Sequence, residues 1–131
     1  MFDLFTKISE DQARQISPVT LAFVGDAVYS MFVRAREVIT ADTKLNELQK
    51  RTSQIVSAKG QNVLLHKIEC KFTQTEVDVY HRGRNAKKGT KSKNASVAEY
   101  NTSTGLEAVL GYLYLTGQYQ RISELLEEDA R

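Results

Sequence analysis

The stretch Leu21–Val33 reads L-A-F-V-G-D-A-V-Y-S-M-F-V and is long enough for a helix that is apolar except for one carboxylate, Asp26. Moving an unpaired carboxylate out of water costs several kcal/mol even after relaxation. Asp26 must therefore lie in a hydrated cleft, bind a metal ion or pair with a cation. A buried ion pair with Arg34, Arg36 or a lysine is the alternative to a functional role.

A second stretch repeats this pattern. Leu106–Leu115 reads L-E-A-V-L-G-Y-L-Y-L, with Glu107 as its single charge and small residues nearby. Two such helices can approach closely enough for both acids to face one point, which is how helices build a divalent metal site. The alternative is a capping box from Thr104 to Glu107, in which the glutamate only marks a helix start.

Length and composition describe one ordinary globular domain, residues 1–131, with 41% hydrophobic and 26% charged residues. One cysteine, Cys70, and two histidines exclude a disulfide framework and a Cys/His zinc cluster, and they suit the reducing cytoplasm. No apolar run is long enough to span a membrane. We therefore expect a cytoplasmic protein.

Helix boundary signals divide the chain, and no strand alternation is present, so we predict an all-α fold. Ser17 and Pro18 begin a helix that runs to about Ile39, and Gly117 ends the second carboxylate helix. The other signals are a cap at Asp42 or Thr43, a break between 57 and 60, a capping box at Thr73 and a cap within 101–104.

The formal net charge of +2 conceals a strong asymmetry. Residues 81–94, H-R-G-R-N-A-K-K-G-T-K-S-K-N, hold six of the 18 basic residues and none of the 16 acids. With Gly83 and Gly89 in it, this segment predicts a mobile surface loop that can follow a phosphate backbone. The alternative is a solvated surface.

Three motifs resemble a known family. F-V-G-D-A-V-Y at Phe23–Tyr29 resembles the signature of the ribonuclease III catalytic domain, and L-E-A-V-L-G-Y-L-Y at Leu106–Tyr114 resembles its second acidic helix. R-G-R-N-A-K at Arg82–Lys87 and the following Y-N-T-S-T resemble the Mini-ribonuclease III family specifically. The similarity covers nearly the whole chain in the right order.

This resemblance implies a helical endonuclease domain that forms a homodimer and cleaves double-stranded RNA with Mg²⁺, leaving 5′-phosphate and 3′-hydroxyl ends. It implies that Asp26 and Glu107 are the metal-binding catalytic acids. For the Mini family it implies maturation of the precursor of 23S ribosomal RNA, and it leaves a ribosomal-protein helper open. Ala22 and Thr104 stand where ribonuclease III has two further acids, and the Mini family shares these losses.

The chain ends at Arg131, which leaves no room for the separate double-stranded-RNA-binding domain of full-length ribonuclease III. We therefore expect the catalytic domain to contact RNA itself. The RNA-binding candidates are Arg82, Arg84, Asn85, Lys87, Lys88, Lys91 and Lys93. Two other classes stay open: a non-catalytic RNA-binding module on the same fold, and a helical protein-interaction domain.

Overall fold

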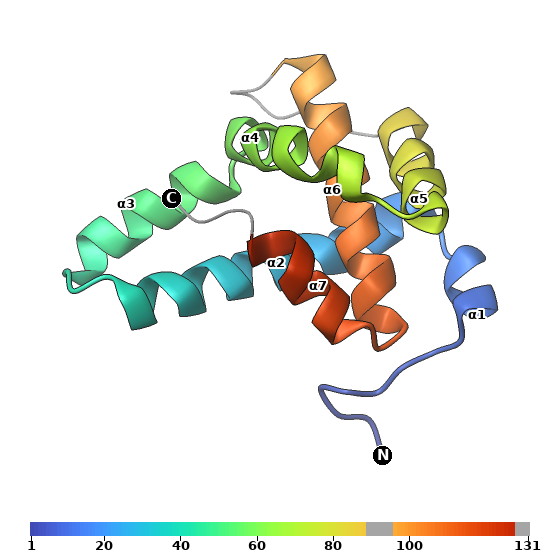
Figure 1. Ribbon diagram of the computed structural model, residues 1–131, viewed down its shortest axis with the longest axis horizontal. Coiled ribbons are helices and arrows are strands. Elements are labelled where there is room, and N and C mark those ends of the chain that lie inside the picture. Colours follow the sequence, from blue (N-terminus) through green and yellow to red (C-terminus); the bar gives the residue numbers. More distant parts are fainter. Residues whose placement is uncertain (89–95, 128–131) are drawn as a thin grey trace.

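Residues 1–88 and 96–127 are described by a computed structural model, and within them every regular element is helical (Figure 1). This confirms the all-α prediction. The elements are α1 (Glu10–Arg14), α2 (Pro18–Thr40), α3 (Leu45–Val56), α4 (Ala58–Ile68), the 3-10 turn η1 (Glu69–Lys71), α5 (Gln74–Asn85), α6 (Val97–Leu115) and α7 (Tyr119–Leu126). None of the helices in the described ranges is long and apolar enough to cross a membrane.

Helix α6 lies at the centre of the fold, where it crosses α2 and also packs against α4, α5 and α7 (Figure 1). Leu106, Leu110 and Leu113 of α6 are buried in one core with Leu21 and Tyr29 of α2. Removing each of these side chains from water stabilises the fold by roughly 1.5–3 kcal/mol. The core therefore fixes the crossing of the two helices that carry the acids.

The two central helices touch through their backbones. A β-carbon added at Gly111 of α6 would lie 1.9 Å from the backbone oxygen of Leu21 in α2. No larger residue fits at that point without moving a helix. The close approach predicted from the small residues is therefore confirmed.

Most helix boundaries follow the predicted signals. Ser17 is the N-cap and Pro18 the first residue of α2, Ser57 caps α4 after a break, and Thr73 and Glu76 form the capping box of α5. Helix α6 ends at Leu115, and Gly117 follows with a φ of 76°, which only glycine adopts without strain.

Two predicted caps are wrong. Lys44, rather than Asp42 or Thr43, is the N-cap of α3 and makes no side-chain capping bond. Helix α6 begins at Val97, with Ser96 and Glu99 as its capping box, so residues 101–104 lie inside the helix. The Thr104 hydroxyl donates to the Tyr100 carbonyl at 2.9 Å, because a hydroxyl can bond to the preceding helical turn as well as cap a helix.

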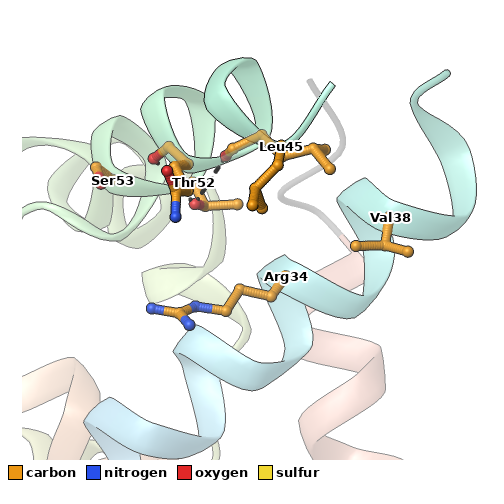
Figure 2. Close-up of a pocket in the computed structure, with 7 residues that line it drawn as sticks. Arg34, Val38, Leu45, Thr52 and Ser53 are labelled. Atoms are coloured by element: carbon orange, nitrogen blue, oxygen red, sulfur yellow. Dashed lines mark hydrogen bonds between the residues drawn. The ribbon is translucent and has the colours of Figure 1, made fainter. Parts of the chain in front are cut away.

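Helix α3 packs against the C-terminal half of α2. Arg51 of α3 pairs with the buried Glu37 of α2 at 2.8 Å. Beyond this ion pair the two helices leave a groove between them, lined by Arg34 and Val38 on one side and by Leu45 on the other (Figure 2). The groove continues the outer face of α2.

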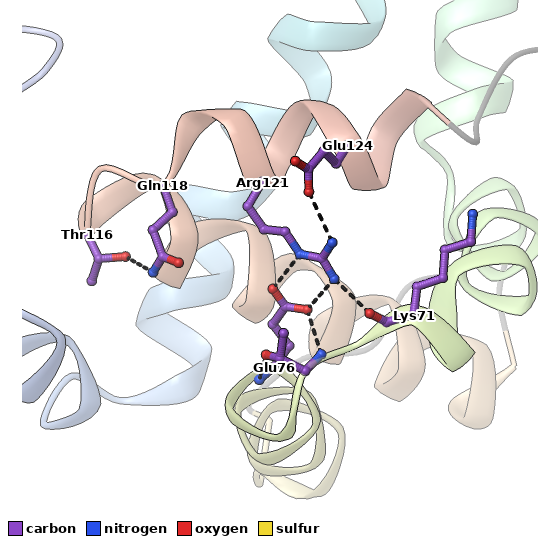
Figure 3. Close-up of polar contacts among 7 residues, drawn as sticks. Lys71, Glu76, Thr116, Gln118, Arg121 and Glu124 are labelled. Carbon is purple, nitrogen blue, oxygen red and sulfur yellow. Dashed lines mark hydrogen bonds and ion pairs between the residues drawn. The ribbon is translucent and has the colours of Figure 1, made fainter.

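An arginine joins the last helix to the rest of the fold (Figure 3). Arg121 of α7 donates to both oxygens of the buried Glu76 at 2.8 and 2.9 Å and to the Lys71 carbonyl at 2.7 Å. Hydrogen bonds from Arg121 to Glu76 raise the pKa of the guanidinium further above its usual range. The pair thus holds α7 against α5 and η1.

Candidate active site

Asp26 and Glu107 come from different helices and line the same pocket. Asp26 lies one residue after Gly25 in α2, and Glu107 lies one turn before Gly111 in α6, so the glycine contact sets both acids beside each other. The pocket is open to solvent and also includes Phe23, Tyr100 and Lys88. The crossing of α2 and α6 thus brings two carboxylates together, and Lys88, which follows α5, adds its side chain to the same pocket.

Asp26 is exposed at this pocket, so the hydrated cleft is the environment that it occupies. Among the described residues no cation forms an ion pair with it. Arg36, one of the predicted partners, lies 3.6 Å from Glu37. The ion-pair alternative is therefore wrong for the described part of the chain.

Glu107 is half-buried, and its Oε2 accepts a 2.9 Å hydrogen bond from the Gln61 side-chain amide. The pKa of the Glu107 carboxyl is raised to about 8, chiefly by burial and also by the neighbouring Asp26 carboxylate, while the Gln61 hydrogen bond opposes the shift. Two carboxylates held this close repel each other when both are ionised. Without a cation the pair is costly when both acids are ionised, so Glu107 keeps its proton to a higher pH.

The alternative explanation of Glu107 as a helix cap is also wrong. The capping glutamate of α6 is Glu99, which accepts from the Ser96 backbone amide at 3.1 Å. Glu107 lies two turns further along, where every backbone amide already has a helical partner. Glu107 therefore has no capping role at the start of α6.

Ala22 and Thr104 line the same pocket. They precede the two acids by one helical turn, so they share the faces that carry Asp26 and Glu107. Within the described ranges no group of three or more His, Cys, Asp and Glu side chains is gathered anywhere. A cation at this pocket would therefore have two protein carboxylates, and water or substrate oxygens would complete its coordination.

The basic segment divides into parts with different surroundings. Arg82, Arg84 and Asn85 belong to the last turn of α5, so the predicted loop was wrong for these residues. Gly83 is a packing contact there, because a β-carbon on it would lie 2.9 Å from the Cα of Gly105 in α6. Lys91 and Lys93 lie outside the described residues.

Lys87 is exposed, but Lys88 turns back to the pocket with the acids. Its ammonium donates to the carbonyls of Gly83, Arg84 and Ala86 at 2.7 to 3.0 Å, which satisfies the end of α5. Burial lowers the pKa of Lys88. The sequence predicted Lys88 as one of several phosphate contacts and did not indicate its place beside Asp26 and Glu107.

Sequence reasoning missed Gln61. It lies in the first turns of α4 between Gly60 and Asn62, where nothing in the sequence sets it apart, and only the packing of α4 against α6 brings it to Glu107. No spacing within one helix could have revealed this contact.

Comparison with known proteins agrees with this geometry. The sequence profile of the Ribonuclease III domain matches residues 19–118, a range that contains both acidic helices. The fold and the site thus define a ribonuclease III-type nuclease domain, a class of endoribonucleases that require a metal ion and cleave double-stranded RNA. The two non-catalytic alternatives are thereby set aside.

Individual relatives of high sequence identity define the family within this class. The chain is 44% identical over 115 residues to a Mini-ribonuclease 3 of Symbiobacterium thermophilum, covering 88% of each sequence. It is 38% identical over 122 residues to a Mini-ribonuclease 3 of Clostridium tetani, covering 92% of this chain and 81% of that one. The chain belongs to the Mini-ribonuclease III family.

A solved structure supports the fold. The crystal structure of a Fusobacterium nucleatum protein superposes with a TM-score of 0.79 at 28% sequence identity, covering 87% of this chain and 91% of the other. The helical arrangement described above is therefore one that a crystallised protein also adopts.

Proposed function

We propose that residues 1–131 form one catalytic domain that cleaves double-stranded RNA with Mg²⁺ at the pocket of Asp26 and Glu107, in the cytoplasm, to mature the ends of precursor 23S ribosomal RNA. Hydrolysis at this site would leave 5′-phosphate and 3′-hydroxyl ends. The observation that carries the proposal is that two carboxylates from separate helices line one open pocket with Lys88 beside them.

The donor set fits Mg²⁺. Carboxylate oxygens are hard ligands, and Mg²⁺ is commonly held by one or two of them while it keeps several waters. The raised pKa of Glu107 reflects burial and the nearby Asp26 carboxylate, and a divalent cation offsets both effects. When bound, Mg²⁺ activates water and neutralises charge on the phosphate.

The side chains of this chain have separate tasks in the proposed reaction. Exposed Asp26 and half-buried Glu107 hold the cation at the pocket, on the side where substrate can enter. Lys88 adds positive charge at the same pocket, where an RNA phosphate would lie, and its bonds to three carbonyls at the end of α5 hold it there. No histidine or serine nucleophile takes part.

The rest of the basic segment is proposed to hold the duplex. Arg82, Arg84 and Asn85 end α5, and Lys87 follows them immediately before Lys88. Positive side chains that continue from the pocket along one helix end can contact successive phosphates of a duplex. Lys91 and Lys93 extend the same set along the sequence.

A homodimer is part of the proposal. The outer face of α2 exposes large apolar side chains, with Phe23 79% exposed and Ile39 81% exposed, and Met31 and Val38 between them. The groove of Figure 2 extends this face to Leu45 of α3. A second copy would cover this surface, and its second pocket would supply the cut in the other strand.

The experiment is incubation of the protein with a precursor 23S ribosomal RNA duplex and with an unrelated duplex, in Mg²⁺ or in EDTA. We expect metal-dependent cleavage with 5′-phosphate and 3′-hydroxyl ends, faster on the precursor. Adding ribosomal proteins tests for a helper. A metal-independent gel shift without cleavage would contradict the proposed reaction, and equal rates on both duplexes would contradict the proposed substrate.

A further inference from the structure

Gln61 is the side chain of α4 that contacts the acid pair. It is only 2% exposed, and its amide nitrogen donates to Glu107 Oε2 at 2.9 Å and to the Val56 carbonyl at 3.0 Å. Among the described residues its own oxygen, Oε1, has no hydrogen-bond partner. A buried amide that leaves one polar atom unpaired incurs a desolvation cost that packing alone does not require.

These two hydrogen bonds fix the direction of the amide. Rotating it by half a turn would place its oxygen against the Val56 carbonyl, which can only accept a hydrogen bond. The nitrogen must therefore face Glu107. The bond to Glu107 also comes from a different helix, so it holds the carboxylate in one orientation relative to α6.

The α3–α4 junction fixes the position of Gln61. Ser57 caps α4 and accepts from the Gln61 backbone amide at 2.9 Å through its carbonyl. A β-carbon at Gly60 would lie 2.1 Å from the Ile55 backbone oxygen, so the first turn of α4 lies directly on the end of α3. Gln61 is thereby held in place by backbone contacts at the α3–α4 junction.

We infer that Gln61 is a positioning residue for the reaction: it occupies one oxygen of Glu107 and orients the carboxylate so that the other oxygen can bind the cation. This rests on the proposed function, in which Glu107 is a metal ligand. Removing a hydrogen bond that a neighbouring residue makes to a ligating carboxylate typically lowers metal affinity or activity 10–100-fold.

The test compares Gln61→Met with Asn62→Leu. Methionine keeps the length of glutamine but cannot donate to Glu107. Asn62 is a matched control, because it also bridges α4 to α6, through the Glu99 carbonyl at 3.3 Å and the Thr102 hydroxyl at 3.0 Å, without contacting Glu107. For each protein we would measure Mn²⁺ binding without RNA, the Mg²⁺ concentration for half-maximal cleavage, duplex affinity without divalent ions, and the thermal midpoint.

We expect both variants to lose some thermal stability, while only Gln61→Met weakens Mn²⁺ binding and raises the half-maximal Mg²⁺ concentration, each about 10-fold or more. Duplex affinity should be unchanged in both. Equal metal affinity in Gln61→Met and wild type would overturn the inference and leave Gln61 as a structural residue. Failure of the proposed function is distinguishable, since wild type itself would then show no metal-dependent cleavage.

Discussion

Gly25 lies directly against the backbone of Glu107: a β-carbon added to Gly25 would be 1.7 Å from the Glu107 carbonyl oxygen. The residue beside one acid is thus in van der Waals contact with the other acid's main chain. No rotamer change can relieve a clash between two backbones, so the separation of the acids depends on this glycine.

Gly25→Ala is therefore expected to push α2 and α6 apart. Forcing an extra methyl group into a packed contact typically costs 1–3 kcal/mol, and here the obstacle is backbone. We expect a lower thermal midpoint together with a loss of cleavage larger than the loss of folded protein. Thr20→Ala, on the exposed face of α2, controls for the added helix propensity. Normal activity in Gly25→Ala would show that the acids tolerate a wider separation.

Asp26→Asn and Glu107→Gln are expected to abolish metal-dependent cleavage while the fold and duplex binding are retained. Each change removes charge with little change in shape. The expected loss in rate is on the order of 10² or more, since removal of one preorganised charge that acts at the transition state costs roughly 3 kcal/mol. The measurements are single-turnover cleavage and a gel shift on one duplex. Retained activity in either variant would remove that residue from the proposed site.

The stability of the metal-free protein should depend on pH through Glu107. Its folded-state pKa is raised from the ordinary 4.5 to about 8, so the folded state keeps a proton that the unfolded state has released between these values. Stability must therefore fall as the pH rises through this window. Glu107→Gln should be more stable than wild type at pH 8 and similar to it near pH 4.5.

Thermal unfolding in EDTA across this pH range tests the prediction. Parallel curves for wild type and Glu107→Gln would mean that the carboxyl is not perturbed. If adding Mg²⁺ restores the stability that wild type has lost relative to Glu107→Gln, the pH dependence is linked to the cation site.

Whether the sequence predicted a feature depends on how far apart in the chain the interacting residues lie. The acids and small residues of α2 and α6 follow helical spacing, so their convergence was predictable from periodicity. The start of a helix that carries several Ser and Thr residues near its beginning was not predictable. The same hydroxyl can cap a helix or bond within it, as that of Thr104 does. Gln61 reaches Glu107 through the packing of α4 against α6, and the Lys88 side chain reaches the pocket by folding back over the end of α5, which no local pattern contains.

Arg121→Met should destabilise the fold without affecting the site directly. It leaves the buried Glu76 without its cation, and breaking one side of a buried ion pair typically costs 3–5 kcal/mol. Because part of Arg121 reaches solvent, the lower end of this range is expected. Urea unfolding measures the loss, and Glu124→Gln, at the exposed end of the same network, is the control with a much smaller effect. A similar loss in both variants would contradict the special role of Glu76.

Lys87 and Lys88 are adjacent in the sequence but should affect the reaction differently. Lys87 is exposed, so Lys87→Ala should remove at most one phosphate contact and reduce the salt dependence of duplex binding by roughly 0.7 to 0.9 in the slope of log K against log salt. Lys88 lines the pocket with the acids, so Lys88→Met should mainly lower kcat.

Lys88→Met also removes three hydrogen bonds at the end of α5, so its thermal midpoint should fall. The two effects are separated by assaying well below that midpoint, at saturating duplex, where the folded fraction is constant. The salt slope of Lys88→Met, measured without divalent ions, shows whether its ammonium also contacts phosphate. Unchanged kcat in Lys88→Met would confine this lysine to capping α5, and the two acids would then act on the phosphate without a neighbouring protein cation.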